Sequence, residues 1–324
     1  MKNKITVSAP GKLMLFGEHA VVYNRPCLVT AVNQRMRVTI ELLKNNDFIL
    51  SAPEVQILNY KKLITDLGNG DIPKGAKFVE IAIKNFIKKY PIKGGLKIVT
   101  KSEFSSLFGF GSSSAATVCT IKALSELFGK KLSKKQIFDL AYKTIFDIQG
   151  KGSGFDVAAA VYGGTLYFVT GGKVIKPLKI KSLPLVVGYS GVKADTVTLM
   201  NQVKEKTDKY SKIIDSVYSD IAQLIPLAQK AILKNDWQTV GELMNFNQGY
   251  LVSLGVSTRK LADMIYVARD VGAYGAKLSG AGGGDCMIAI APSVKIKTIN
   301  KAISDAGGKI IKIDANAEGV RIEP

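Results

Sequence analysis

The sequence is poor in the side chains that most often build metal centres and disulfides, with one histidine and three cysteines among 324 residues. A single histidine, His19, excludes a metal centre with several histidine ligands. A Ser-His-Asp triad would depend on His19, and nothing near it indicates one. The cysteines, Cys27, Cys119 and Cys286, are far apart and odd in number, which argues against a disulfide framework or a CxxC metal site. We expect them to be small buried side chains.

Long hydrophobic runs are also missing. No apolar run approaches the roughly 18 to 20 residues that span a bilayer. The first residues, MKNKITV, lack the apolar core of a signal peptide. We therefore expect a cytoplasmic protein without a membrane partner.

Acidic residues are fewer than basic ones. The chain has 26 aspartates and glutamates and 45 lysines and arginines, which gives a net charge of +19. Nucleic acid is the first partner that such a charge suggests. The lysines, however, are spread along the whole chain, and no zinc finger or aromatic RNA-binding signature accompanies them. A basic protein can equally attract small anions such as phosphates or carboxylates. We expect small anions and no nucleic acid.

The arrangement of strands and helices predicts an α+β fold. Hydrophobic residues make up 47% and charged residues 22%, as in globular proteins. Strands and helices alternate without the regular order of a doubly wound sheet. We expect two short strands at 5–7 and 13–16, joined by a proline–glycine turn. Apolar periodicity predicts further strands at 35–43, 96–99, 166–169, 185–189, 276–278 and 286–290, and helices at 78–90, 115–128 and 133–148, with several more between 195 and 271.

Two local features of the sequence mark the start of a helix and the boundary between two lobes. Ser133 with Gln136 forms a capping-box pattern at the start of the helix 133–148. The segment 171–184 is basic and contains two prolines, so we place the boundary between an N-terminal lobe, 1–172, and a C-terminal lobe, 173–324.

The strongest chemical signal is the glycine- and serine-rich loop GFGSSSAA at 109–116, which leads into a helix. Glycines allow close backbone approach, and successive N–H groups at a helix N-terminus cradle an anion. The loop lacks the G-K-[S/T] of a P-loop and the context of a dinucleotide fingerprint. The alternative is a serine N-cap after a glycine turn.

Two further glycine-rich loops and the N-terminal segment carry candidate groups. The loop GKGSGFD at 150–156 ends in Asp156, which is either an N-cap or a carboxylate that takes a proton from a substrate hydroxyl. The loop KLSGAGGGD at 277–285 has more glycines than a tight turn needs, which favours ligand contact. Near the N-terminus, Lys12 lies between two glycine turns that flank an apolar strand.

Three segments together resemble the GHMP kinase family, which includes galactokinase, homoserine kinase, mevalonate kinase and phosphomevalonate kinase. They are SAPGK at 8–12, GFGSSSAA at 109–116 and KLSGAGGG at 277–284, in the family's order. The resemblance covers nearly the whole chain. It implies a two-lobed α+β fold with the active site in the cleft between the lobes.

Within the family, GEHAVVY at 17–23 and the stretch 245–257 are similar to the mevalonate kinase branch, whereas 152–157 and 284–286 look more like the phosphomevalonate kinase branch. The resemblance implies an ATP-dependent kinase that phosphorylates the C5 hydroxyl of mevalonate, a step in isoprenoid precursor synthesis. The alternatives are a kinase for 5-phosphomevalonate and a non-catalytic relative that binds an anion or nucleic acid.

The resemblance also assigns roles to residues. Asp156 accepts or orients the substrate proton, and Lys12 keeps Asp156 ionised and offsets charge on the transferred group. Mg²⁺ accompanies ATP and contacts Ser113. The family's acidic magnesium ligand falls at Ile145 here, and Asp147, two residues later, is the remaining acidic candidate. The ATP-binding residues are Gly109, Phe110, Gly111, Ser112, Ser113 and Ser114, and the substrate contacts are Glu18, His19, Thr196, Gly280, Ala281, Gly282 and Gly283. The expected partners are ATP and mevalonate, and a homodimer stays open.

Overall fold

The N-terminal lobe is built on an eight-stranded sheet in the computed structural model, which describes residues 3–324. Its main path runs β12-β1-β2-β5-β3-β4, and β6 pairs with both β2 and β7. All pairs are antiparallel except β3 with β5. The strands are β1 (Lys4–Phe16), β2 (Pro26–Leu43), β3 (Asp47–Ala52), β4 (Ile57–Leu63), β5 (Gly95–Ser102), β6 (Thr165–Val169), β7 (Val174–Leu178) and β12 (Arg321–Ile322).

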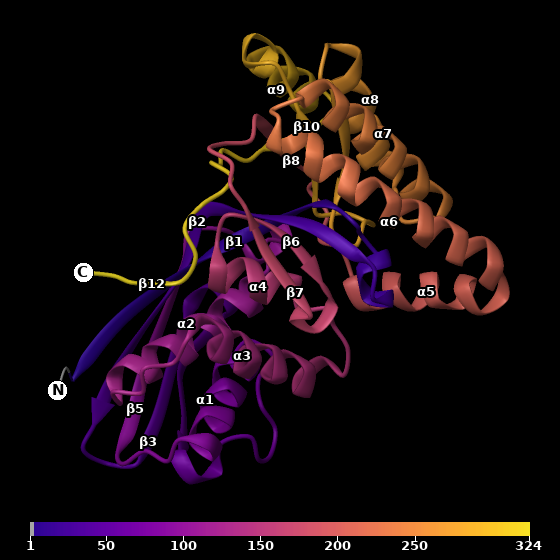
Figure 1. The fold of residues 1–324 in the computed structure, drawn as a ribbon. Coiled ribbons are helices and arrows are strands. Elements are labelled where there is room, and N and C mark those ends of the chain that lie inside the picture. The colour runs from indigo at the N-terminus through magenta and orange to yellow at the C-terminus, as the bar shows by residue number, and fades with distance from the viewer. Residues whose placement is uncertain (1–2) are drawn as a thin grey trace.

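Four helices pack on this sheet and on one another (Figure 1). Of these, α2 and α4 lie directly against β1 and β2, and α1 and α3 pack on α2. Their apolar faces form a continuous core with the sheet, which includes Phe86, Phe138 and Phe168. The helices are α1 (Lys77–Lys89), α2 (Ser112–Leu127), α3 (Lys134–Gln149) and α4 (Phe155–Tyr162).

The C-terminal lobe holds a four-stranded antiparallel sheet in the order β11-β8-β10-β9. Helices α7, α8 and α9 pack against this sheet, α6 packs on α7 and on β2 of the first sheet, and α5 packs on α6 (Figure 1). The elements are β8 (Leu185–Tyr189), β9 (Gly275–Ser279), β10 (Cys286–Ile290), β11 (Lys309–Ile310), α5 (Thr196–Lys209), α6 (Ser211–Leu233), α7 (Trp237–Ser253), α8 (Arg259–Asp270) and α9 (Ile296–Asp305).

The first strand differs from the sequence prediction. The expected turn at Pro10 and Gly11 is wrong, because β1 continues through both residues as one strand of 13 residues. The pairing with β2 shifts there instead, since Pro10 faces Arg35 whereas Gly11 faces Val32. Proline lacks the N–H that a regular ladder needs, so a bulge accommodates it. Gly11 lies close to the glycine-rich loop before α2, because a Cβ atom on Gly11 would be 3.2 Å from the Phe110 Cβ.

The other predicted elements are confirmed. Helices α1, α2 and α3 and strands β2, β5, β6, β8, β9 and β10 occur at the expected places, with ends that move by a few residues and with β2 longer than expected. The capping box at the start of α3 is present, because Ser133 and Gln136 each bond the other's backbone. The three cysteines are buried and free.

The lobe boundary needs revision. Strand β7 pairs with β6 in the first sheet, so the chain leaves that sheet only after Leu178. We therefore propose the boundary at 179–184 rather than at 172/173. The C-terminal strand β12 returns to pair with β1, so the last residues also belong to the N-terminal sheet (Figure 1).

None of the helices in residues 3–324 combines the length and the apolar character that crossing a membrane would require.

Candidate active site

A cleft of about 290 Å³ lies where the three glycine-rich loops meet the N-terminal strand. Its walls come from β1, from the N-terminal ends of α2, α4 and α5, and from the loop between β9 and β10. Most of the predicted site residues, from positions up to 269 residues apart in sequence, line it. They are Lys12, Glu18, His19, Gly109, Gly111, Ser112, Ser113, Asp156, Thr196, Gly280 and Ala281.

Two helix N-termini face this cleft without a side-chain cap. Gly111 precedes α2 with φ of 78°, and Gly154 precedes α4 with φ of 88°. Positive φ favours glycine at both positions. The first N–H groups of a helix have no partner within it, and they carry the positive end of the helix dipole. The cleft therefore receives two donor-rich, electropositive helix ends, which suits a phosphate-bearing ligand.

Lys12 is a buried lysine that reaches from β1 to the loop before α2. Its Nζ donates to the Gly109 carbonyl at 2.7 Å, and its backbone N–H donates to the Phe110 carbonyl at 3.0 Å. The Phe155 ring lies under the ammonium, 5.3 Å from ring centroid to Nζ. Burial lowers the pKa of Lys12, and the nearby carboxylates of Asp156 and Asp285 oppose that change. The ammonium is thus a desolvated cation in the cleft, where its field acts with little screening.

Asp156 stands in the first turn of α4 and faces the same cleft. Its carboxylate accepts from the Ser114 hydroxyl at 2.5 Å and from the Val157 N–H at 3.0 Å. Gly111 lies between Asp156 and Lys12, because a Cβ atom on Gly111 would be 3.5 Å from the Asp156 Cβ and 3.4 Å from the Lys12 Cε. A carboxylate and an ammonium therefore flank the glycine at which α2 begins.

A buried ion pair connects the N-terminal segment to the third loop. Glu18 and Lys277 are 1% and 0% exposed, and the Lys277 ammonium bonds the Glu18 Oε1 and, at 2.6 Å, the Leu278 carbonyl. Burial raises the pKa of Glu18 and lowers that of Lys277, and their contact opposes both changes. The second oxygen, Oε2, is buried without a partner. Glu18 therefore lines the cleft with a carboxylate that is held by Lys277 through one oxygen.

Replacing Lys277 by methionine should destabilise the fold by about 3–5 kcal/mol, because it leaves the Glu18 carboxylate buried and uncompensated. The free energy of unfolding in urea measures this loss. The double variant E18Q/K277M should recover most of it, since neither partner then carries a charge. A K277M protein as stable as the wild type would contradict the ion pair.

His19 is held against the third loop in a fixed tautomer. Its Nε2 lies 2.9 Å from the Ala281 carbonyl, which only accepts, so Nε2 carries the proton. Burial lowers the pKa of His19, and the imidazole is neutral at pH 7. Its Nδ1 is left as an acceptor. Thr196 faces the same cleft from the first turn of α5, which Asp195 caps by accepting from the Val197 and Thr198 N–H groups.

Four predicted contact residues are not part of the cleft wall. Phe110 is buried against Phe104 and Phe108. Ser114 is buried and reaches the site only through Asp156. Gly282 and Gly283 pack away from the cleft on Val256 and Leu199, as Cβ atoms there would be 2.2 Å from the Val256 carbonyl oxygen and 2.5 Å from the Leu199 Cδ1. These two glycines shape the loop and do not line the cleft.

Asp147 is not a member of the site. It is exposed on α3, where it accepts from Lys143 at 2.8 Å and from the Asn85 side chain at 3.0 Å. Ile145 and Gln149 face the cleft instead. The physical reason is helical rotation, because residues two apart on a continuous helix point about 200° apart. The structure does not support Asp147 as a magnesium ligand.

Three further charged residues line the cleft: Lys151, Lys193 and Asp285. The two lysines are the sequence's candidates for balancing a more negatively charged acceptor, whereas the sequence analysis missed Asp285 as a site residue. Each lies within or close to a segment that the sequence analysis identified, and this proximity is the only sequence signal for a role at the site. Asp285 is buried, with φ of 54°, and its carboxylate accepts from the Ala194 N–H at 2.9 Å. Lys193 lies 3.8 Å from this carboxylate.

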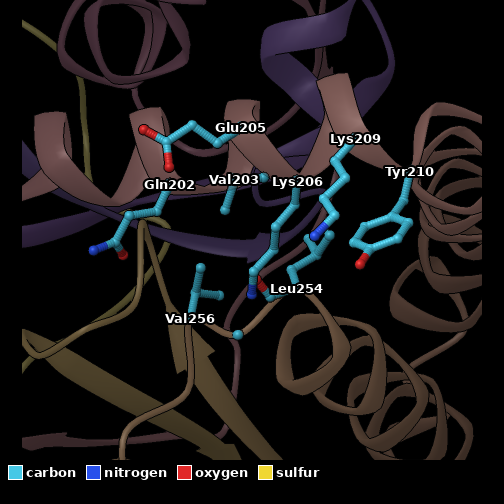
Figure 2. A pocket seen from close by; sticks show the side chains of 9 residues that line it. Gln202, Val203, Glu205, Lys206, Lys209, Tyr210, Leu254 and Val256 are labelled. Atoms are coloured by element: carbon cyan, nitrogen blue, oxygen red, sulfur yellow. The ribbon is translucent and has the colours of Figure 1, made fainter.

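A separate hollow of about 370 Å³ lies between α5 and the turn at 254–256 (Figure 2). Lys206 reaches from α5 to the Leu254 carbonyl, with 2.8 Å from Nζ to oxygen. The residues around it come from none of the glycine-rich loops. The turn nevertheless supports the third loop, because the Gly283 N–H donates to the Val256 carbonyl at 2.7 Å. We therefore treat this hollow as structural.

Comparison with known proteins identifies the family. The GHMP kinases N terminal domain matches residues 77–164, and the GHMP kinases C terminal domain matches residues 228–308. The mevalonate kinase of Thermococcus sibiricus is 34% identical over 99% of this chain and 98% of its own length. The chain belongs to the GHMP kinase family. Its cleft thus lies between the two parts that the family defines.

Solved structures of GHMP kinases share the fold over nearly the full length. The Methanococcus jannaschii mevalonate kinase is 28% identical, with a TM-score of 0.83 over 97% of this chain and 98% of its own. The L. major mevalonate kinase, solved in complex with R-mevalonate, is 25% identical, with a TM-score of 0.79 over 98% of this chain and 97% of its own. A Streptococcus pneumoniae phosphomevalonate kinase is only 18% identical, with a TM-score of 0.81 over 96% and 99%, and shows the fold alone.

Proposed function

We propose that this GHMP kinase transfers the γ-phosphoryl group of ATP to the C5 hydroxyl of mevalonate, giving 5-phosphomevalonate. The observation that carries the proposal is the convergence of Lys12 and Asp156 on the glycine at the start of α2. The mevalonate kinase relatives, similar over the whole chain, support the choice of substrate.

The cleft fits ATP with Mg²⁺. The N–H groups of Ser112 and Ser113 in the first turn of α2 would bind the phosphates, and the Ser113 hydroxyl is the proposed protein ligand of the metal. Among the described residues, no cluster of three or more acidic, histidine or cysteine side chains could hold a metal. This suits Mg²⁺, which keeps several waters and is often held by one or two protein groups plus substrate phosphates. Bound Mg²⁺ would neutralise phosphate charge during transfer.

Positioning and charge compensation are the main contributions of the protein to phosphoryl transfer. Asp156 would accept a hydrogen bond from the C5 hydroxyl and take its proton as the oxygen–phosphorus bond forms. The Ser114 hydroxyl holds the carboxylate in place through its bond to Oδ2. Lys12 would offset negative charge on the transferring group from its desolvated position on β1.

Other residues of the cleft supply an acceptor and cations for the rest of the substrate. The His19 Nδ1 can accept from a hydroxyl, and Glu18 lines the same cleft. Lys151 and Lys193 line the same cleft, and an ammonium there can attract the mevalonate carboxylate. Thr196 is the remaining proposed substrate contact.

Release of ADP from Mg·ATP, with mevalonate and 5-phosphomevalonate compared side by side, tests this function. We expect turnover with mevalonate and little with 5-phosphomevalonate. The second substrate carries two more negative charges. Of the three lysines beside the motif loops, Lys277 is already paired with Glu18, which leaves only Lys151 and Lys193 to balance them. Turnover with 5-phosphomevalonate alone would contradict the proposal and favour the phosphomevalonate kinase branch.

A further inference from the structure

Asp285 occupies a position that its own backbone does not favour. Its φ is 54°, in the left-handed region that glycine adopts more easily than other residues, and it ends a run of three glycines. It is 6% exposed, and its Oδ1 accepts from the Ala194 N–H at 2.9 Å. A buried carboxylate at a strained residue indicates that the side chain has a task at this site.

The carboxylate of Asp285 packs directly on the first glycine of the loop before α2. A Cβ atom on Gly109 would lie 2.4 Å from the Asp285 Oδ2, so only glycine fits there. The carbonyl of that same glycine accepts from the Lys12 ammonium at 2.7 Å. Asp285, the Gly109 peptide and Lys12 therefore form a direct sequence of contacts from the C-terminal lobe to the proposed catalytic lysine.

Neighbouring contacts attach the same part of the C-terminal lobe to this loop. Lys193 Nζ donates to the Ser106 carbonyl at 2.8 Å and lies 3.8 Å from the Asp285 Oδ1. The Cys286 thiol donates to the Phe108 carbonyl at 3.3 Å. Of these three residues, Lys193 and Asp285 also line the cleft, and Asp285 alone brings a carboxylate to it.

Four charged or titratable groups face Lys12. Asp156 on α4 and Asp285 after the third loop favour its protonated form, as does Cys286 at the start of β10, whereas Lys193 before α5 disfavours it. Burial disfavours the protonated form most strongly. Of the two carboxylates, Asp156 is assigned to the substrate hydroxyl, which leaves Asp285 to balance the charge of the lysine.

We propose that Asp285 is a positioning residue for phosphoryl transfer, which holds Lys12 in place through the Gly109 peptide and balances its charge. The proposal rests on the function proposed above. In this arrangement the Asp285 carboxylate is held by the Ala194 N–H and packs on Gly109, and it acts on the reaction through Lys12.

Two variants separate the charge of Asp285 from its contacts. D285N keeps an oxygen for the Ala194 N–H and removes the negative charge, while D285G suits the positive φ and removes both. D263N is the matched control, because Asp263 is a half-buried aspartate on α8 that pairs with Arg259 outside the cleft. Kinetics are measured against pH with Mg·ATP and mevalonate, and the pKa of Lys12 is measured by side-chain ¹⁵N NMR in the free protein, with K12M to assign the signal.

We expect D285N to lower kcat by about 10-fold, with the KM for ATP changed by less than about 3-fold. Because a neighbouring anion raises the pKa of an ammonium, its loss lowers the pKa of Lys12, and the alkaline decline of kcat/KM begins at lower pH. D285G should lose more activity, and D263N should match the wild type.

A D285N protein with wild-type kcat and an unchanged pKa of Lys12 would overturn the proposal. The NMR measurement needs no substrate. If the wild-type protein fails to phosphorylate mevalonate, the proposed function falls, while the pKa of Lys12 in D285N still decides whether Asp285 acts on that lysine.

Discussion

Replacing Asp156 by asparagine should lower kcat by about 10²-fold or more, while the affinity for ATP stays near that of the wild type. Asparagine has the same size, and its oxygen can still accept from the Ser114 hydroxyl, so the local structure persists. It cannot take the proton of the attacking hydroxyl. The phosphate-binding N–H groups belong to α2 and are untouched. Steady-state ADP release gives kcat, and titration with a non-hydrolysable ATP analogue gives the affinity.

The matched control is D147N, because Asp147 is exposed on α3 and bonds Lys143 and Asn85 outside the cleft. It should keep wild-type kcat and wild-type dependence on Mg²⁺. Turnover by D156N within about 3-fold of the wild type would remove Asp156 from the mechanism. Loss of Mg²⁺ dependence in D147N would instead restore Asp147 as a metal ligand.

Replacing Lys12 by methionine should lower kcat by about 10²- to 10³-fold and should not unfold the protein. A buried ammonium acts strongly on charge that develops nearby, because little solvent screens it. Methionine has a similar length and fills the same space without a charge. Removing a charge whose burial is costly should leave the thermal midpoint of unfolding equal to that of the wild type or higher.

Turnover and thermal unfolding are measured on the same preparation of K12M. The control is K135M, which removes an exposed lysine of α3 that pairs with Asp139. Near-wild-type turnover by K12M would contradict the role of Lys12. A large drop in the thermal midpoint would show that Lys12 is needed for the fold, and the kinetic result would then require K12R to separate charge from shape.

The local signals in the sequence were the most dependable. The serine–glutamine pattern at 133–136 predicted a capping box because the bonds involved span three residues. The loop at 109–116 predicted an anion-binding helix end for the same reason, and α2 begins within it without a side-chain cap. The turn expected at Pro10 was wrong, because the partner strand decides whether a proline–glycine pair ends a strand or forms a bulge.

The sequence by itself determined the family, the three glycine-rich loops and the residue types that they present, because these depend on short stretches of backbone. Only the tertiary structure decided which side chains meet. Lys277 forms an ion pair with Glu18, 259 residues away, and Asp285 packs on Gly109. Asp147 points away from the cleft while Ile145 faces it. Such pairings depend on how the two lobes pack against each other and on which face of a helix is buried. A short stretch of sequence determines neither of these.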